Sequence, residues 1–154
     1  MSETLRIERL TSAQRPLLDK FYKAQRSGMR SVAGADCWAV RSAEVIAAAN
    51  LLKVERGWWL TGLCVATDCR GKGIGSRLLT EVAHHYPEPI WLFCDPGLRG
   101  FYQASGYVPT EDLPAMLAER IQRYRRHKTL LAMVCTLPAL QSSATSSPGN
   151  STSV

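Results

Sequence analysis

The sequence predicts an α/β (α+β) domain with a mixed, mostly antiparallel sheet, and three observations support that class. Short apolar runs, rich in aromatic and β-branched residues, alternate with amphipathic stretches whose apolar residues recur at helical spacing. The 154 residues suffice for one domain with a real core. A glycine-rich turn at residues 70–75 leads directly from an apolar run into an amphipathic one.

The first elements are a strand and a helix. Residues 5–10 alternate apolar and charged side chains, which is typical of a half-exposed strand. A hydroxyl from Thr11 or Ser12 can cap the helix that follows, because it accepts a hydrogen bond from an unpaired N–H group. Pro16 falls in the first turns, where proline is tolerated, and Gly28 is expected at or near the end of the helix.

Three antiparallel strands come next. Residues 36–41 and 44–54 predict a hairpin with a tight turn at 42–43, although the alanines of the second segment would also suit a helix. The turn before that segment and the Arg-Gly pair at 56–57 after it favour strands. The apolar run 58–65 is the third strand.

The second half begins with a buried strand and a short helix. Residues 90–94 are almost entirely apolar, as expected for a strand covered on both faces. Asp95 is a good N-cap for the next helix, in which Leu98 and Phe101 are expected to lie in the core. Gly106 is expected to end that helix in left-handed geometry, before another strand from residue 107.

The chain then predicts one more helix and a last strand. Thr110 resembles the cap of a helix that carries acidic residues in its first turn and a basic cluster later, over 111–128. Residues 129–137 predict the final strand. We therefore expect a single domain over 1–138. The Ser/Thr-rich segment 139–154 is predicted to be disordered, because it has too little apolar surface to bury.

Composition excludes several classes of protein. The apolar runs are too short for a membrane span, which needs about 20 residues, and the first residues do not form a secretory leader. The five cysteines include no Cys-x-x-Cys pair, so neither a metal site nor a disulfide framework is expected, and a reducing cytoplasm is the expected location. The net charge is +6, but the basic residues are dispersed, which disfavours nucleic-acid binding. The one dense cluster consists of Arg120, Arg123, Arg125, Arg126 and Lys128. Its simplest interpretation is a solvated helix face; the alternatives are attraction for an acidic partner and proximity to the phosphates of a ligand.

The turn at 70–75 reads Arg-Gly-Lys-Gly-Ile-Gly and opens the amphipathic helix 76–86. A helix N-terminus has unpaired N–H groups and the positive end of the helix dipole, and glycines let a phosphate approach the backbone closely. The spacing matches neither the P-loop motif nor the Gly-x-Gly-x-x-Gly dinucleotide motif. The turn therefore predicts a diphosphate site of another kind, with added charge from Arg70, Lys72 and Arg77.

This form, Arg-x-x-Gly-x-Gly, resembles the acetyl-CoA loop of the GCN5-related N-acetyltransferase (GNAT) superfamily. A second stretch, Asp95 to Tyr107, resembles the family's helix that ends in Phe-Tyr and is followed by Gly-Phe/Tyr and a strand. The resemblance is close over residues 58–109. It implies a twisted sheet of six to seven strands with helices on both faces.

The resemblance also implies a site for acetyl-CoA as co-substrate, without a metal. The pantetheine arm would pair with the backbone of Leu63, Cys64 and Val65, with Gly62 as a further candidate. The diphosphate would lie on residues 70–76. The implied cofactor-binding set is Leu63, Cys64, Val65, Arg70, Gly71, Lys72, Gly73, Ile74, Gly75, Ser76 and Asp95, although many relatives have asparagine where Asp95 stands.

The resemblance implies that Tyr102 is the catalytic residue, because it stands where the family's Phe-Tyr pair has its tyrosine. Acetyl transfer to an amine releases a thiolate, and a phenol close to the sulfur can donate a hydrogen bond or a proton. The alternative is a tyrosine that only packs. Some relatives have a glutamate as general base at a position that is Thr61 here. A water on Thr61 could relay the proton; the other candidates for the base are Glu55, Glu111, Asp112 and the histidines, although His84, His85 and His127 are better explained as surface residues.

The acceptor stays open between small-molecule amines, amino acids, peptide N-termini and lysine side chains. Acidic residues at 111 and 112 would suit a cationic amine. The resemblance also implies that Arg26, Met29, Arg30 and Ser31 are candidates for the acceptor site, because the corresponding region often lines it in the family. The helix within 111–128 could shape that site or form a homodimer surface. The functional prediction is direct N-acetyl transfer to a primary amine; the alternative is a non-catalytic CoA-binding or regulatory module.

Overall fold

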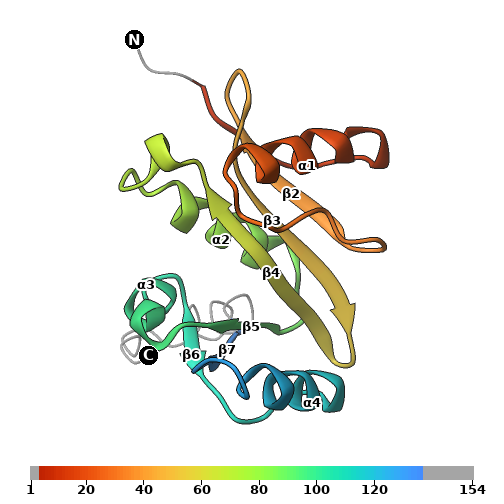
Figure 1. Ribbon diagram of the computed structural model, residues 1–154, viewed down its shortest axis with the longest axis vertical. Coiled ribbons are helices and arrows are strands. Elements are labelled where there is room, and N and C mark those ends of the chain that lie inside the picture. Colours follow the sequence, from red (N-terminus) through yellow and green to blue (C-terminus); the bar gives the residue numbers. More distant parts are fainter. Residues whose placement is uncertain (1–3, 137–154) are drawn as a thin grey trace, which may run out of the picture.

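The computed structural model describes residues 4–136, and these contain one seven-stranded sheet in the order β1-β2-β3-β4-β5-β7-β6 (Figure 1). All neighbouring strands are antiparallel except β4 and β5, which are parallel. The strands are β1 (Arg6–Arg9), β2 (Asp36–Arg41), β3 (Val45–Val54), β4 (Gly57–Val65), β5 (Ile90–Cys94), β6 (Tyr107–Pro109) and β7 (Leu131–Cys135). The α-helices are α1 (Arg15–Ala24), α2 (Ile74–His85), α3 (Arg99–Gln103) and α4 (Ala115–Tyr124).

Helices cover both faces of the sheet, as predicted. One face packs against α2 and includes Trp38 and Val40 of β2, whereas the neighbouring residues Cys37 and Ala39 pack against α1 on the other face. This alternation follows from the two-residue period of a strand. Helix α4 covers Trp59 of β4 and the apolar side chains of β5 and β7. The predicted disordered segment 139–154 lies outside the described residues.

The alanine-rich segment is the strand β3 rather than a helix. Ala47, Ala48 and Ala49 are completely buried between the two helix layers. Backbone pairing with β2 and β4 on both edges overrides their helix propensity, since propensity is a weak preference compared with tertiary packing. The small side chains let α1 and α2 approach the middle of the sheet.

A bulge at Gly62 changes which face the residues of β4 present. Asn50 pairs with Thr61 and Ala48 pairs with Cys64, so β4 has one residue more than β3 between these pairs. Gly62 takes a φ of 71°, in the left-handed region. The extra residue shifts the alternation, so that Leu63 follows Leu60 on the α2 face.

Helix α1 ends earlier than predicted, at Ala24 rather than near Gly28. Arg26 adopts a left-handed φ of 56°. The N–H group of Ser27 donates to the carbonyl of Tyr22 at 3.2 Å, and that of Arg26 donates to Lys23 at 3.0 Å. This is the Schellman arrangement, with arginine in the place that glycine usually takes. Because the residue is not glycine, the sequence did not indicate that the helix ends here.

Helix α4 also differs from the prediction, because it begins at Ala115 with Pro114 as its N-cap and no acidic residue in its first turn. The Thr110 hydroxyl accepts a hydrogen bond from the N–H group of Asp112 at 3.0 Å, so it stabilises a turn before the helix. Proline disfavours helical geometry in the residue before it, and the helix therefore starts after Pro114. None of the helices in residues 4–136 has the length and apolarity that crossing a bilayer requires.

Candidate active site

The parallel strands β4 and β5 separate soon after they meet, which opens the sheet. Their register joins Trp58 to Ile90 and Trp59 to Trp91. On its other edge β4 stays paired with β3 as far as Val65. Within the described chain, residues 60–65 therefore have no neighbouring strand on the β5 side, and Figure 1 shows β4 diverging there from β5 and α3. Two cavities lie along this opening.

The larger cavity, of about 780 Å³, extends from the end of β4 to the first turn of α2 and to α3. It brings together most of the predicted cofactor-binding residues, which sequence alone placed on separate elements. Those that line it are Leu63, Cys64, Val65, Arg70, Gly71, Gly73, Ile74, Gly75 and Ser76. Lys72 and Asp95 do not line either cavity; Asp95 instead accepts a hydrogen bond from the N–H group of Gly97 at 2.8 Å.

Glycine is required in the turn for its backbone geometry. Gly71 and Gly73 have φ values of 80° and 78°, and Gly73 is the N-cap of α2. A Cβ atom placed on either glycine would have no atom within 4 Å. The glycines therefore provide left-handed backbone and leave the space before the helix open.

The amide groups of this turn are available to a ligand. The N–H group of Arg77 donates to the carbonyl of Gly73 at 3.0 Å, which closes the first turn of α2. Within residues 4–136, no hydrogen bond of good geometry has an N–H group of residues 71–76 as its donor. Helix α2 contributes the positive end of its dipole at the same place, so the turn favours an anion.

Arg70 fixes the turn to the end of β4. Its Nε atom donates to the carbonyl of Val65 at 3.1 Å. Burial raises the pKa of the neighbouring Cys64 thiol, and this effect exceeds the opposing effect of the Arg70 charge. The thiol therefore stays protonated at neutral pH, which argues against a nucleophilic role for Cys64.

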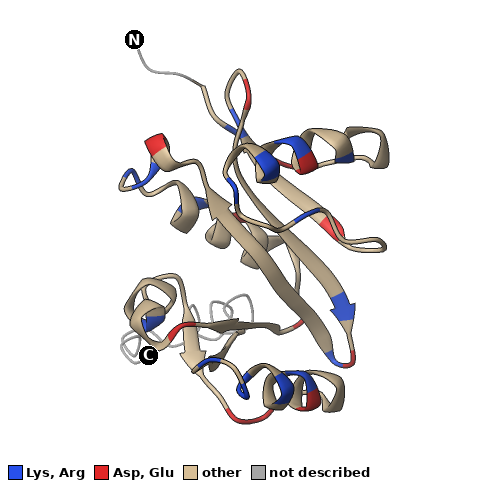
Figure 2. Cartoon of the chain, viewed as in Figure 1, with Lys and Arg blue, Asp and Glu red and all other residues tan. Residues whose placement is uncertain are grey.

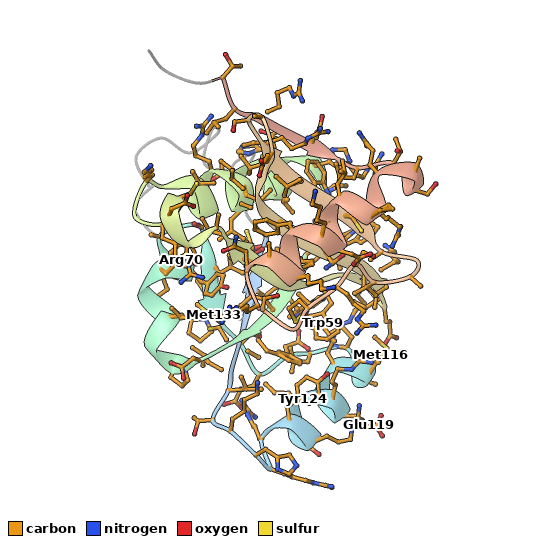
Figure 3. All side chains as sticks on the ribbon, turned by 45° about the horizontal axis from the view of Figure 1, so that its top comes forward. Trp59, Arg70, Met116, Glu119, Tyr124 and Met133 are labelled. Atoms are coloured by element: carbon orange, nitrogen blue, oxygen red, sulfur yellow. The ribbon has the colours of Figure 1, made fainter. Side chains whose placement is uncertain are left out.

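The smaller cavity, of about 460 Å³, lies on the other side of Tyr102 and extends toward α4. Met29, Leu63 and Tyr102 line both cavities, so the two spaces adjoin at these side chains. Figure 3 shows Arg70 beside the turn before α2, and Trp59 and Tyr124 on the side of α4. The remaining lining residues are Trp59, Leu60, Thr61, Gly62, Leu92, Phe93, Tyr124, Lys128 and Leu130.

Tyr102 is nearly buried, with 8% of its surface exposed. Its ring contacts Phe101 and Tyr107 edge-on, at centroid distances of 4.9 and 6.0 Å. No group in the described part of the chain hydrogen-bonds its hydroxyl. Burial, and then the nearby Cys94 thiol, raises the pKa of Tyr102 to about 12, so the phenol is neutral over the physiological range.

Leu98 and Phe101 are not core residues, and that prediction is wrong. They expose 47% and 38% of their surface and line the larger cavity. The ring of Phe101 would lie 3.3 Å from a Cβ atom on Gly75, so this glycine allows α2 and α3 to pack closely. Helical spacing identifies an apolar face, but it does not distinguish a face that meets the core from one that faces a ligand.

A buried polar network supports the bulge and was not predicted. The hydroxyl of Tyr22 donates to the carbonyl of Gly62 at 2.6 Å and accepts from Asn50 Nδ2 at 3.3 Å. Asn50 is completely buried, and its Oδ1 atom accepts from the N–H group of Val32 at 3.4 Å. The carbonyls of Gly62 and Val65 already have partners, in Tyr22 and Arg70, so they are weaker candidates for pairing with a ligand than the backbone groups of residues 63 and 64.

Of the predicted acceptor-site residues, only Met29 lines either of these two cavities; Arg26, Arg30 and Ser31 do not. Ser31 instead holds its loop to α1, because its N–H group donates to Asp19 Oδ1 at 2.6 Å. The candidates Glu55, Glu111 and Asp112 also lie outside both cavities, and Asp112 forms an exposed ion pair with Arg56 at 3.4 Å.

None of the three histidines lines either cavity. A ring nitrogen of His84 lies 2.8 Å from the carbonyl of Thr80, and His85 contacts the rings of Trp38 and Tyr86. Thr61, in contrast, lines the smaller cavity. In residues 4–136 there is also no group of three or more His, Cys, Asp or Glu side chains that could hold a metal ion.

Comparisons with known proteins support the fold. No curated protein matches the chain significantly. Escherichia coli ElaA is 18% identical with a TM-score of 0.60, over 87% of this chain and 99% of that chain. Tetrahymena GCN5 is 14% identical with a TM-score of 0.63, over 88% of this chain and 97% of that chain.

A third similar structure is N-acetylglutamate synthase from Neisseria gonorrhoeae, in complex with coenzyme A and N-acetyl-glutamate. It is 12% identical with a TM-score of 0.68, over 88% of this chain and 35% of that chain. At these identities the structures show the fold alone. The model of the Acetyltransferase (GNAT) family matches residues 3–107, more than half of the sequence. The chain therefore belongs to the GNAT acetyltransferase family.

Proposed function

We propose that this protein transfers an acetyl group from acetyl-CoA directly to a primary amine. The observation that carries the proposal is the meeting of the two cavities at Tyr102, one leading to the unpaired amides before α2 and the other toward α4. The first has the form of a diphosphate and pantetheine site, and the second has room for an acceptor.

The chain's own groups have separate roles in this mechanism. The N–H groups of residues 71–76 would hold the diphosphate, because they combine unpaired donors with the helix dipole. The unpaired edge of β4 at residues 63–65 would hold the pantetheine arm in the manner of an added strand. When bound, acetyl-CoA would supply an acetyl group activated by its thioester.

Tyr102 would assist departure of the sulfur. The amine nitrogen forms a bond to the carbonyl carbon, the C–S bond breaks with its electron pair on sulfur, and the amine loses one proton. A thiol has a pKa of about 8.5, well below that of Tyr102, so full proton transfer from the phenol would be unfavourable. The buried, neutral hydroxyl instead donates a hydrogen bond to the developing thiolate.

The proton lost by the amine needs an acceptor. A free alkylamine has a pKa of about 10 and must be neutral to attack. No carboxylate or imidazole lines either cavity in the described chain. A water held by the Thr61 hydroxyl and nearby carbonyls would relay this proton to solvent.

Two measurements test the proposal. Isothermal titration should show micromolar-class binding of acetyl-CoA, and incubation with a panel of amines should release CoA. Absence of acetyl-CoA binding would contradict the proposal.

The second candidate is a non-catalytic CoA-binding module, and the lack of a carboxylate or imidazole base along the two cavities favours it. Acetyl-CoA binding without CoA release from any amine would support this alternative.

A further inference from the structure

The smaller cavity has one charged side chain among its described lining residues, and that side chain is Lys128. The other polar side-chain groups along it are the hydroxyls of Thr61, Tyr102 and Tyr124 and the indole N–H of Trp59. A cationic group bound there would lose hydration without gaining a counter-charge, which is costly. An anionic group could pair with the Lys128 ammonium through a charge-assisted hydrogen bond.

The turn that carries Lys128 is fixed to the cavity wall. Arg125 donates from Nε and Nη2 to the carbonyl of Leu130, at 3.1 and 3.0 Å, and Leu130 lines the cavity. These contacts close the segment 125–130, so Lys128 extends from a held turn rather than from a free terminus.

The charge behind the cavity wall is also positive. The guanidinium of Arg120 lies 4.7 Å from the centre of the Trp59 ring. The acidic residue of α4, Glu119, lies 3.8 Å from Arg123 and does not line the cavity, and Figure 3 shows it on the outer side of the helix. Figure 2 shows β4 and β5 without charged residues and α4 with several basic ones. The local field therefore adds to that of Lys128.

Aromatic rings form much of the wall between Lys128 and Tyr102. The ring centroids of Trp59 and Phe93 are 5.5 Å apart, and those of Phe93 and Tyr124 are 6.3 Å apart with the rings nearly perpendicular. A volume of about 460 Å³ is the size of a small-molecule site. This wall suits an apolar or aromatic body.

We propose that the acceptor is a small amine that carries a carboxylate and an apolar or aromatic body. Its amine would lie at Tyr102, where the cavities adjoin, its body along Trp59 and Phe93, and its carboxylate near Lys128. A single ammonium matches a singly charged anion. This inference rests on the proposed function, and it reverses the expectation of a cationic acceptor, because Glu111 and Asp112 lie outside the cavity.

The test compares L-phenylalanine with L-phenylalaninamide and phenethylamine, which keep the ring and the amine but lack the carboxylate. With the full chain and acetyl-CoA, CoA release should give a kcat/KM about tenfold higher for the acid, the effect of one charge-assisted hydrogen bond. Lys128→Met should abolish this preference, and Lys128→Glu should reverse it. The control Arg126→Gln removes a nearby charge outside the cavity and should leave the preference unchanged.

A binding measurement makes the test independent of turnover. Isothermal titration of CoA-loaded protein should show tighter binding of L-phenylalanine than of its amide, and Lys128→Met should remove the difference. Equal affinities, no binding of the acid, or faster acetylation of a peptide N-terminus would overturn the inference. Absence of CoA release from every amine would overturn the proposed function, while the titration would still decide the preference for an anion.

Discussion

Tyr102 illustrates how a single side chain can be placed by a motif and then defined by its surroundings. The Phe-Tyr pair pointed to this residue, and the structure places it at the meeting of both cavities with no hydrogen-bond partner in the described chain. The neighbouring Tyr107 also has a buried hydroxyl without a partner, but it lies outside the cavities. The two tyrosines therefore form a matched pair for mutation.

Tyr102→Phe should lower kcat by about tenfold to a hundredfold and leave the affinity for acetyl-CoA nearly intact, because the lost hydrogen bond acts on the leaving sulfur. Steady-state kinetics and isothermal titration measure the two effects. Tyr107→Phe removes a phenol of similar burial and should keep wild-type kcat. A Tyr102→Phe enzyme with unchanged kcat would remove Tyr102 from its proposed role.

The pH profile of activity follows from the same residue. Attack needs a neutral amine, so kcat/KM should rise with pH toward the pKa of the acceptor. Tyr102 keeps its proton because burial raises its pKa to about 12. Ionisation of Tyr102 should therefore not lower kcat/KM at any pH below about 10. If kcat/KM fell below pH 9 and Tyr102→Phe abolished that fall, the neutral-phenol role would be contradicted.

Residue-level prediction was weakest where a side chain faces a cavity. Leu98 and Phe101 had the spacing of core residues, yet they line the larger cavity. Lys128 was one member of a basic cluster, and nothing in its sequence context separated it from Arg126. Which surface a side chain reaches depends on how distant elements pack, and periodicity within one element does not contain that information.

At the scale of elements, the turn between β4 and α2 is the feature that sequence predicted most directly. Its glycines, its place after a strand and the helix beyond it can all be read locally. The bulge at Gly62 and the separation of β4 from β5 depend on pairing with distant strands. A glycine inside a strand pointed to an irregularity there, but not to its partners Tyr22 and Asn50.

Gly73→Ala tests this turn. A Cβ atom on a residue with φ of 78° would cost about 1 kcal/mol and tilt the amides that face the cavity, so we expect acetyl-CoA affinity to fall about tenfold or more. Isothermal titration and urea unfolding measure the two effects.

Gly34→Ala is the control, because Gly34 has φ of 81° and equally open space but lies away from both cavities. The Gly34→Ala variant should lose a similar amount of unfolding free energy and keep the wild-type affinity for acetyl-CoA. An equal loss of affinity in both variants would assign the effect to general strain.

At the scale of the whole molecule, the buried phenols and thiols make stability sensitive to alkaline pH. Burial raises the pKa of Tyr22, Tyr102, Tyr107 and Tyr86, and also that of the Cys37, Cys64 and Cys94 thiols. In the unfolded chain these groups lose their protons at about pH 8.5 for thiols and about pH 10 for phenols. Above these values the unfolded state binds fewer protons than the folded state, so stability falls as pH rises.

The free energy of unfolding from urea titrations should therefore decline from about pH 9 upward and more steeply above about pH 10. Tyr107→Phe removes one buried phenol and should make the decline shallower. A free energy of unfolding that stays constant to pH 11 would show that these groups ionise equally in both states.

The order of elements and the class of fold were predictable across residues 4–136, because hydrophobic periodicity and turn residues are local signals. The seven-stranded order, with β7 between β5 and β6, was not read from the sequence. Strand order is set by which apolar faces can be buried together, and each strand alone is compatible with several neighbours.

The central claim is that the unpaired amides before α2 hold the diphosphate of coenzyme A. Amide NMR spectra of ¹⁵N-labelled protein, recorded during titration with CoA, observe these groups directly. The account predicts the largest shifts at Gly71 through Ser76 and smaller ones along residues 63–65. Saturating binding of CoA with unchanged signals from residues 71–76 would contradict it.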